Sequence, residues 1–430
     1  MGGSERKHST SGGGKRKRLP VFSIVLISCY LVISALVFAY GIREGPGRAP
    51  AAPSAEPTTP VSTVAPVETP TPDVGQPAEQ SIPLPPAIKV KGIWVGAWYA
   101  GDQEKMDNYI ELIDRTELNA IVLDVKEEYG HVTFLTENEL ISDTARNLIP
   151  DISDLLNNLN SRNIYPIARV VCFKDPIRAS NNPQYAILDI NGNQWRDKGD
   201  TMWIDPYKRE NWEYIAEVCL EAARLGFKEV QLDYVRFPVE GKLSDIDYGQ
   251  AGELQTRAEV IAEFVGYIRD TMHNVGVRTS VDVFAISGIS ESDSNYLGQD
   301  VRLLLPSLDA ISPMIYPSHF ANEGTGPFGN GVGSIINGEL FKRPALEPYG
   351  VVFNALAHFS RLMDGHNPNE AVMRPFIQNS TDAFLGEGFY ITYGADEVRA
   401  QIEAVYDAGF EEWLVWNNVS VYSEDAFLEE

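Results

Sequence analysis

From residue 89 onward, short apolar segments alternate with longer segments whose apolar positions recur every three to four residues. Short apolar runs are typical of buried strands, and the three-to-four spacing is typical of helices that cover a sheet. Eight segments have the strand pattern: 91–99, 119–126, 164–173, 230–238, 278–284, 310–316, 372–378 and 412–416. Seven have the helix pattern: 105–116, 152–160, 209–225, 255–273, 299–305, 351–363 and 396–408. This alternation predicts an α/β fold with a parallel sheet.

The number of strands favours a (β/α)8 TIM barrel with loop insertions over about 340 residues. A doubly wound open sheet is the main alternative, and it usually carries a glycine-rich phosphate loop after its first strand. Here the first strand ends in the segment AWYAG at 97–101, which has no GxGxxG spacing. We therefore expect the closed barrel.

The hydrophobic pattern before residue 89 is different. Residues 21–40 contain no charged side chain, which matches the ~20 residues that a helix needs to span a bilayer. A cleavable signal peptide is the alternative, but its apolar core is usually only about 7–15 residues long. Residues 1–20 are strongly basic, so the positive-inside rule keeps them in the cytoplasm. The pattern predicts a cytoplasmic tail at 1–20 and a single transmembrane signal anchor at 21–40.

Residues 41–88 form a third kind of segment. They hold 12 of the 27 prolines and no aromatic residue, so they cannot bury a core. We expect a disordered, Pro-rich linker that joins the anchor to a barrel domain at 89–430. The predicted location is therefore the cell membrane, with the C-terminal domain on the extracellular side.

Charge, cysteine content and missing motifs exclude several classes of function. The chain has a formal net charge of −25, and the basic tail leaves the rest of it more acidic still, so binding to nucleic acid is not expected. Cys29 lies in the predicted span. Cys172 and Cys219 fall in apolar runs of the barrel domain, where they either pair or remain buried thiols. No CxxC, HxH or HExxH spacing occurs, so we expect neither a metal nor another cofactor. There is also no GxSxG nucleophile elbow.

Carboxylates fall near the ends of three predicted strands, where TIM barrels place their catalytic groups. They are Asp124 on the second strand, Asp233 on the fourth and Asp282 on the fifth. Because neighbouring strands lie under ~5 Å apart, Asp233 and Asp282 are expected to face one cleft. Hydrolysis of a glycosidic bond needs two such carboxyl groups. The pattern predicts Asp233 as nucleophile or base, Asp282 as acid, and Asp124 as electrostatic support or substitute acid.

Each carboxylate also has a structural interpretation. Asp233 could form an ion pair with Arg236 at the end of a strand that continues to residue 238. Asp282 could be a hydrogen-bonded carboxylate under the barrel rim, and Asp124 could pair with Lys126 or Arg169. Glu128, on the loop after Asp124, is a further candidate for the acid.

Aromatic and amide side chains interleave with these acids, as in clefts that stack on sugar rings and hydrogen-bond their hydroxyl groups. The candidate substrate-binding residues are Trp98, Arg169, Trp203, Arg236, Tyr316, His319, Gln378, Asn379 and Trp416. Some have alternative roles. Arg169 could instead position a carboxylate, Trp203 could pack under a long loop, and His319 could cap a loop.

Several motifs resemble the DUF4015 family of glycoside hydrolase domains. They are KGIWVGAWYAG at 91–101, AIVLDVKEEYGHVTF at 120–134, VQLDYVRFP at 230–238, ISPMIYPSHF at 311–320 and RPFIQNST at 374–381. The resemblance implies a TIM barrel distantly similar to α-amylase-like and melibiase-like barrels, in which an Asp on the fourth strand is the nucleophile. Asp233 matches that place. The acid in those relatives is a Glu on the fifth strand or an Asp on the sixth, whereas this chain offers Asp282 on the fifth.

These observations predict a membrane-anchored extracellular glycoside hydrolase that cleaves a polysaccharide or oligosaccharide with two carboxylates. The alternative is a non-catalytic glycan-binding protein of the cell surface, built on a degenerate hydrolase barrel.

Overall fold

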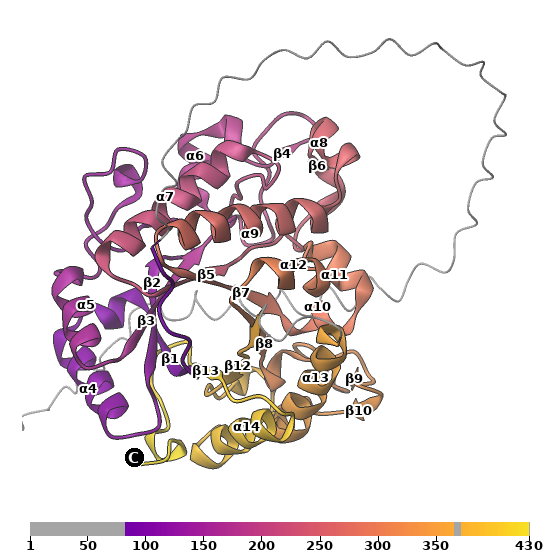
Figure 1. Cartoon of the computed structure of the whole chain (residues 1–430). Helices are drawn as coiled ribbons and strands as arrows, with labels where there is room; N and C mark the ends of the chain where they lie inside the picture. Colours follow the sequence, from indigo (N-terminus) through magenta and orange to yellow (C-terminus); the bar gives the residue numbers. More distant parts are fainter. Residues whose placement is uncertain (1–81, 365–370, 430) are drawn as a thin grey trace, which may run out of the picture.

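The computed structural model describes residues 82–364 and 371–429, and these form a closed barrel of eight parallel strands (Figure 1). In chain order the barrel strands are β1 (Lys91–Val95), β2 (Ala120–Lys126), β3 (Tyr165–Val171), β5 (Glu229–Asp233), β7 (Arg278–Phe284), β8 (Ala310–Ile315), β12 (Phe376–Gln378) and β13 (Trp413–Trp416). Each pairs with the next, and β13 pairs with β1 to close the ring. The predicted TIM barrel is confirmed.

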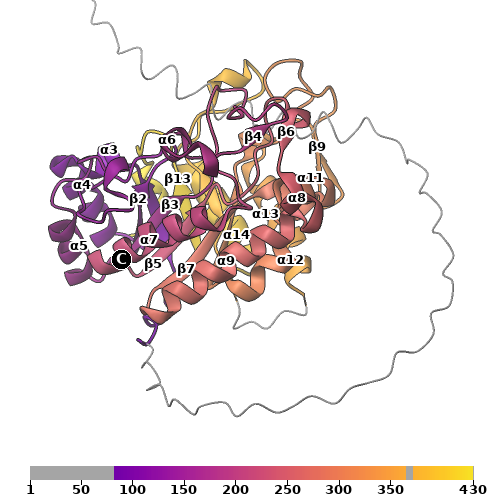
Figure 2. The ribbon, with the colours of Figure 1, turned by 90° about the horizontal axis from the view of Figure 1, so that it is seen from above.

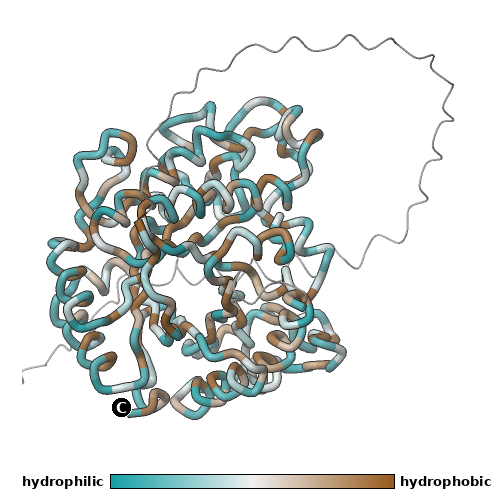
Figure 3. The backbone as a smooth tube through the Cα atoms, in the orientation of Figure 1, coloured by the Kyte–Doolittle hydropathy of each residue, from teal (hydrophilic) through white to brown (hydrophobic). Residues whose placement is uncertain are grey.

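Helices cover the outside of the ring, as Figures 1 and 2 show from two directions. The long ones are α4 (Gln103–Asp114), α5 (Ile152–Ser161), α7 (Arg209–Leu225), α9 (Arg257–Asn274), α13 (Pro348–Met363) and α14 (Ala395–Asp407). Local sequence sets their ends. The helix α7 ends at Gly226, whose φ of 108° suits a residue without a Cβ, and α9 begins at a Thr256–Glu259 capping box. These helices bury their apolar faces against the strands, which are mostly hydrophobic in Figure 3.

Shorter elements lie in the connections. They are α3 (Ala97–Ala100), α6 (Pro176–Asn181), α8 (Gly249–Leu254), α10 (Ala285–Ile289), α11 (Glu291–Leu297) and α12 (Val301–Leu304). The short strands β4 (Leu188–Asp189) and β6 (Ile246–Asp247) pair with each other, as do β9 (Ser334–Ile336) and β10 (Glu339–Phe341). The β4–β6 pair joins the long insertion after β3 to the loop after β5. Both connections therefore rise from the C-terminal end of the barrel, where the strand-end carboxylates lie.

Three of the predicted strands are shorter or interrupted in the structure. The first ends at Val95, and the following residues form α3. The strand predicted at 230–238 ends at Asp233, because Tyr234 has a φ of 50° and turns the backbone out of the extended conformation. The seventh is split into β11 (Val372–Met373) and β12, since Pro375 between them has no N–H for the ladder.

A buried ionic network closes the end of the barrel at which the strands begin. Arg374 Nη1 lies 2.7 Å from Glu229 Oε1, and its Nε lies 2.8 Å from Glu412 Oε2. The Ser280 hydroxyl also donates to Glu229, and Tyr165 donates to the other Glu229 oxygen at 3.4 Å. We call these five residues the barrel floor. Arg374 thus pairs with both glutamates, and both oxygens of Glu229 accept hydrogen bonds.

The chain enters the barrel domain next to this floor. Pro85 O accepts a hydrogen bond from Arg278 Nη2 at 2.8 Å, and Arg278 is the first residue of β7. Residues 82–88, the end of the predicted linker, form neither helix nor strand. The predicted tail, the signal anchor at 21–40 and most of the linker lie outside the described residues. No helix in the described part of the chain is long and apolar enough to cross a membrane.

The two cysteines of the barrel domain are buried free thiols. Burial raises the pKa of Cys172 well above its usual range and that of Cys219 to about 12. The interpretation as unpaired, unreactive core cysteines therefore holds for this structure.

Candidate active site

Arg169 is at the centre of a cluster of acids at the C-terminal end of the barrel. Its Nη1 lies 2.7 Å from Asp124 Oδ1, while Nε and Nη2 donate to Asp233 Oδ2 at 2.9 and 2.6 Å. The cluster forms because β2, β3 and β5 are neighbours and their alternating residues point into the barrel. The structure thus supports the interpretation in which Arg169 positions carboxylates, because its guanidinium bonds to both Asp124 and Asp233.

Asp282 is beside Asp233. The register of β5 and β7 pairs Leu232 with Val281, so the next two residues of the strands are the two acids. Asp282 is 1% exposed, and in the described residues its Oδ1 has no hydrogen-bond partner. Burial, followed by the charge of Asp233, raises the pKa of Asp282 well above its usual range. These surroundings therefore favour the protonated form of Asp282.

Asp233 has the opposite surroundings. Two hydrogen bonds from the Arg169 guanidinium stabilise its negative charge, and the Tyr234 N–H donates to its other oxygen at 2.5 Å. Two adjacent carboxyl groups in unlike surroundings can supply both a base or nucleophile and an acid, the pair that glycoside hydrolysis uses.

Asp124 is the third member of the cluster. Besides Arg169, it accepts a hydrogen bond from Trp94 Nε1 at 2.9 Å. Burial raises the pKa of Asp124, and the Arg169 charge acts against that rise. Lys126, the other candidate partner, instead pairs with Asp175 at 2.8 Å, where both side chains are fully buried.

Aromatic rings from three strands gather over the cluster. Tyr316, which follows β8, stacks on Trp416 of β13 with centroids 5.0 Å apart, and Trp94 of β1 lies 6.4 Å from Trp416. His319 packs edge-on against Tyr316 at 5.2 Å. The structure therefore brings together Tyr316, His319 and Trp416, and it adds Trp94. Alternation along β1 is the signal that could have identified Trp94, because it shares the inward face with Gly92.

The other predicted binding residues have different surroundings. Trp203 is buried under the β3–α7 insertion, with Nε1 bonded to Asp197 Oδ2 at 3.0 Å. The Arg236 guanidinium lies over the rings of Trp203, Tyr234 and Phe284. Both side chains support the walls around the acids.

The remaining three are at the periphery or within loop contacts. Trp98 is 75% exposed on α3. The buried Gln378 side chain accepts from the Ser318 N–H and hydroxyl at 3.1 and 3.0 Å. Asn379 bonds to Ser423 through both amide atoms. The amides of Gln378 and Asn379 thus fix the loops that follow β8 and β13.

Besides Trp94, two more residues near the cluster were not among the sequence candidates. Tyr234 carries its strained backbone directly after Asp233, and Lys174 Nζ lies 4.9 Å above its ring. Glu127, on the loop after β2, accepts hydrogen bonds from the Tyr129 and His131 N–H groups. Burial, and then the charge of Glu128, raises the pKa of Glu127 to about 8. A left-handed tyrosine and a buried loop acid leave no periodic signal in a sequence.

The acids are nearly closed to solvent, with Asp233 4% and Asp282 1% exposed. The three cavities described for residues 82–364 and 371–429 lie elsewhere, two along α9 and one beside the β4–β6 pair. Within those residues, no group of three His, Cys, Asp or Glu side chains is arranged to hold a metal ion. The positive charge inside the cluster is the Arg169 guanidinium.

Comparisons with known proteins identify the family and support the fold. The model of the family DUF4015, described as "Putative glycosyl hydrolase domain", matches residues 92–422. A search of curated proteins found no match. Among solved structures, the glycoside hydrolase domain of PgaB (BpsB) from Bordetella bronchiseptica has a TM-score of 0.51 at 13% identity, over 77% of this chain and 95% of that one. This similarity supports the barrel fold.

Two further solved structures have lower TM-scores. A hypothetical protein from Ruminiclostridium thermocellum is 33% identical over 44% of this chain and 97% of its own, with a TM-score of 0.41. The α-galactosidase TtGalA from Thermus thermophilus, in complex with stachyose, is 12% identical over 79% of this chain and 64% of its own, with a TM-score of 0.47.

Proposed function

Because the chain belongs to the DUF4015 family of glycosyl hydrolase domains, we propose that it hydrolyses glycosidic bonds of a polysaccharide with Asp233 and Asp282. The observation that carries the proposal is the unlike surroundings of these two neighbours. Arg169 stabilises the charge of Asp233, whereas burial beside that charge raises the pKa of Asp282 and favours its protonated form.

In the proposed reaction, the Asp282 carboxyl group protonates the leaving oxygen as the glycosidic bond breaks. Asp233 attacks the anomeric carbon or removes a proton from the attacking water. Arg169 holds Asp233 in place and links it to Asp124, which supports the positive charge that develops on the sugar ring. The rings of Trp94, Trp416 and Tyr316 provide apolar faces for sugar rings at the mouth of the barrel.

We also propose that residues 21–40 anchor the enzyme in the cell membrane with the barrel outside. The contact between Pro85 and Arg278 supports a tether that joins the barrel at its floor. The chain reaches the barrel at the N-terminal ends of the strands, and the acids lie at the C-terminal ends. A tether that arrives at the floor holds the mouth away from the membrane, toward polymeric substrate.

A second candidate function is glycan binding without turnover. The observation that favours it is the near-complete burial of Asp233 and Asp282, because a hydrolase has to bring both groups against a sugar ring.

Replacing Asp233 with Asn separates the two functions. The full chain and its Asp233→Asn variant are incubated with galactomannan, xylan, hydroxyethyl cellulose, glycol chitosan and pullulan, and released reducing ends are measured together with binding. An enzyme loses turnover by about 10³-fold or more while its affinity for the polymer stays. Asp154→Asn, an exposed acid on α5, is the matched control and keeps full activity. A wild-type chain that binds a polymer and never cleaves one is a binding protein.

A further inference from the structure

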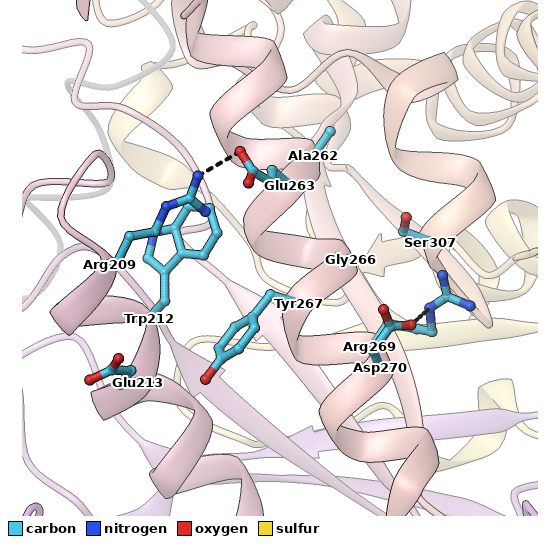
Figure 4. A pocket seen from close by; sticks show the side chains of 10 residues that line it. All are labelled: Arg209, Trp212, Glu213, Ala262, Glu263, Gly266, Tyr267, Arg269, Asp270 and Ser307. Carbon is cyan, nitrogen blue, oxygen red and sulfur yellow. Dashed lines mark ion pairs between the residues drawn. The ribbon is translucent and has the colours of Figure 1, made fainter. Parts of the chain in front are cut away.

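A cavity of about 500 Å³ lies on the outer face of the barrel, between α7 and α9 (Figure 4). It is separate from the acids at the mouth, which point into the barrel interior. Trp212 of α7 and Tyr267 of α9 form its aromatic part, with ring centroids 6.1 Å apart. Trp212 is buried, whereas Tyr267 is 39% exposed and so presents ring surface to a ligand.

A glycine in the middle of α9 keeps the cavity open. Gly266 is helical, so its backbone conformation does not require glycine, and glycine inside a helix costs up to about 1 kcal/mol relative to alanine. Packing does not require it either, because an added Cβ would only approach Ser307 Oγ at 3.4 Å, an ordinary contact. The absent side chain leaves space next to Tyr267, in the lining of the cavity (Figure 4).

Five charged side chains line this space, of which four form two ion pairs and the fifth is Glu213. Arg209 Nη2 lies 2.7 Å from Glu263 Oε2, and Arg269 Nε lies 3.0 Å from Asp270 Oδ1, as the dashed lines in Figure 4 mark. Arg209 also stacks on Trp212, with its guanidinium carbon 3.5 Å from the ring centroid. Paired charges select neither an anion nor a cation. They present many fixed donors and acceptors beside an aromatic face, which suits a neutral ligand rich in hydroxyl groups.

We propose that this cavity is a second polysaccharide-binding site, in which a sugar ring stacks on Tyr267 and its hydroxyl groups bond to the paired charges. The inference rests on the proposed function for its ligand class, because a polymer held at the mouth can also reach the side of the same barrel. Two linked sites bind one chain more tightly than either site alone, since the second contact forms at a high effective concentration. The site would therefore favour long polymers over short oligosaccharides.

Affinity electrophoresis tests this site without any requirement for cleavage. The full chain carrying Asp233→Asn is run through gels that contain each of the five soluble polysaccharides named above. Tyr267→Ala and Gly266→Leu are added separately in this background. Each is expected to weaken binding to the retarding polymer by about 10-fold or more, because one removes the stacking face and the other fills the cavity. Tyr349→Ala, with the same 39% exposure on α13, is the matched control and leaves retardation unchanged.

Folding is controlled within the same set of variants. Leucine is a good helix former, so Gly266→Leu is expected to melt at or above the temperature of its parent while it loses polymer binding. The site is refuted if no gel retards the parent, or if Tyr267→Ala and Gly266→Leu are retarded as strongly as the parent. Loss of retardation in both variants, together with a wild-type chain that releases no reducing ends, would leave the site standing and refute the proposed hydrolysis.

Discussion

The two ends of the barrel contain the same grouping of side chains, one buried arginine between two carboxylates. At the floor, Arg374 links Glu229 to Glu412, and at the mouth, Arg169 links Asp124 to Asp233. The difference is the fifth-strand neighbour. At the floor it is Ser280, which donates a hydrogen bond to Glu229, whereas at the mouth it is Asp282, a third acid whose Oδ1 has no hydrogen-bond partner among residues 82–364 and 371–429.

This difference supports the proposal that the arrangement is structural at the floor and catalytic at the mouth. At the floor, the neutral Ser280 hydroxyl donates a hydrogen bond to Glu229 and adds no third acid. In the equivalent position at the mouth, burial and the charge of Asp233 raise the pKa of Asp282 and favour its protonated form. In the proposed reaction, Asp282 is the proton donor and Asp233 is the nucleophile or base.

The largest expected effect is on proton donation at the mouth. Asp282→Asn removes the donor, so hydrolysis of a polysaccharide should fall by about 10²–10⁴-fold, the usual contribution of a general acid. Dinitrophenyl glycosides of the same sugar have a leaving group that needs no proton, and their hydrolysis should fall by less than about 10-fold. Steady-state rates on the two substrates measure the contrast. Equal losses on both would remove Asp282 from the role of acid.

The next effect contrasts the two arginines. Arg374→Met leaves Glu229 buried and unpaired, so we expect the free energy of unfolding to fall by about 3–5 kcal/mol. Activity per folded molecule should not change. Arg169→Met should instead lower activity per folded molecule by about 10²-fold or more, because Asp233 loses the donors that stabilise its charge. Denaturant unfolding and rate measurements on the two variants test this. If Arg374→Met lowers activity per folded molecule as much, the two ends are not functionally distinct.

The smallest effect is on the pH dependence of stability. The pKa of Asp282 is higher in the folded chain than in the unfolded chain, where it is about 3.9. The folded state therefore binds more protons above that pH, and its stability falls as the pH rises toward the folded pKa. Asp282→Asn removes this loss. The melting temperature of the variant relative to wild type should rise from about pH 4 upward. A constant difference across this range would show that Asp282 ionises normally in the fold.

Most of the architecture could be predicted from the sequence, because a parallel barrel buries each strand between helices and leaves long apolar runs. The neighbouring positions of Asp233 and Asp282 followed from strand order and alternation. The end of β5 did not, because the left-handed Tyr234 lies within an apolar run that continues to residue 238. The bridge formed by Arg169 joins three strands, and such a contact depends on register and side-chain length that no local pattern encodes.

The proposed site on the outer helices could not be predicted from the sequence, for a different reason. Arg209, Trp212, Tyr267 and Gly266 are ordinary residues of amphipathic helices, and their meeting depends on how α7 and α9 pack. Lys126 is a similar case, because its partner Asp175 lies on a loop that follows another strand.

The most direct test of the central claim is the infrared spectrum of the carboxyl groups at pH 7, compared between the wild-type chain and Asp282→Asn. A protonated carboxyl group and an ionised carboxylate absorb in separate regions, so the protonation state of Asp282 can be read without a substrate. If Asp282 is the proposed proton donor, the variant loses one protonated carboxyl band and no carboxylate band. Loss of a carboxylate band instead would show that Asp282 is ionised beside Asp233, which contradicts its role as the proton donor.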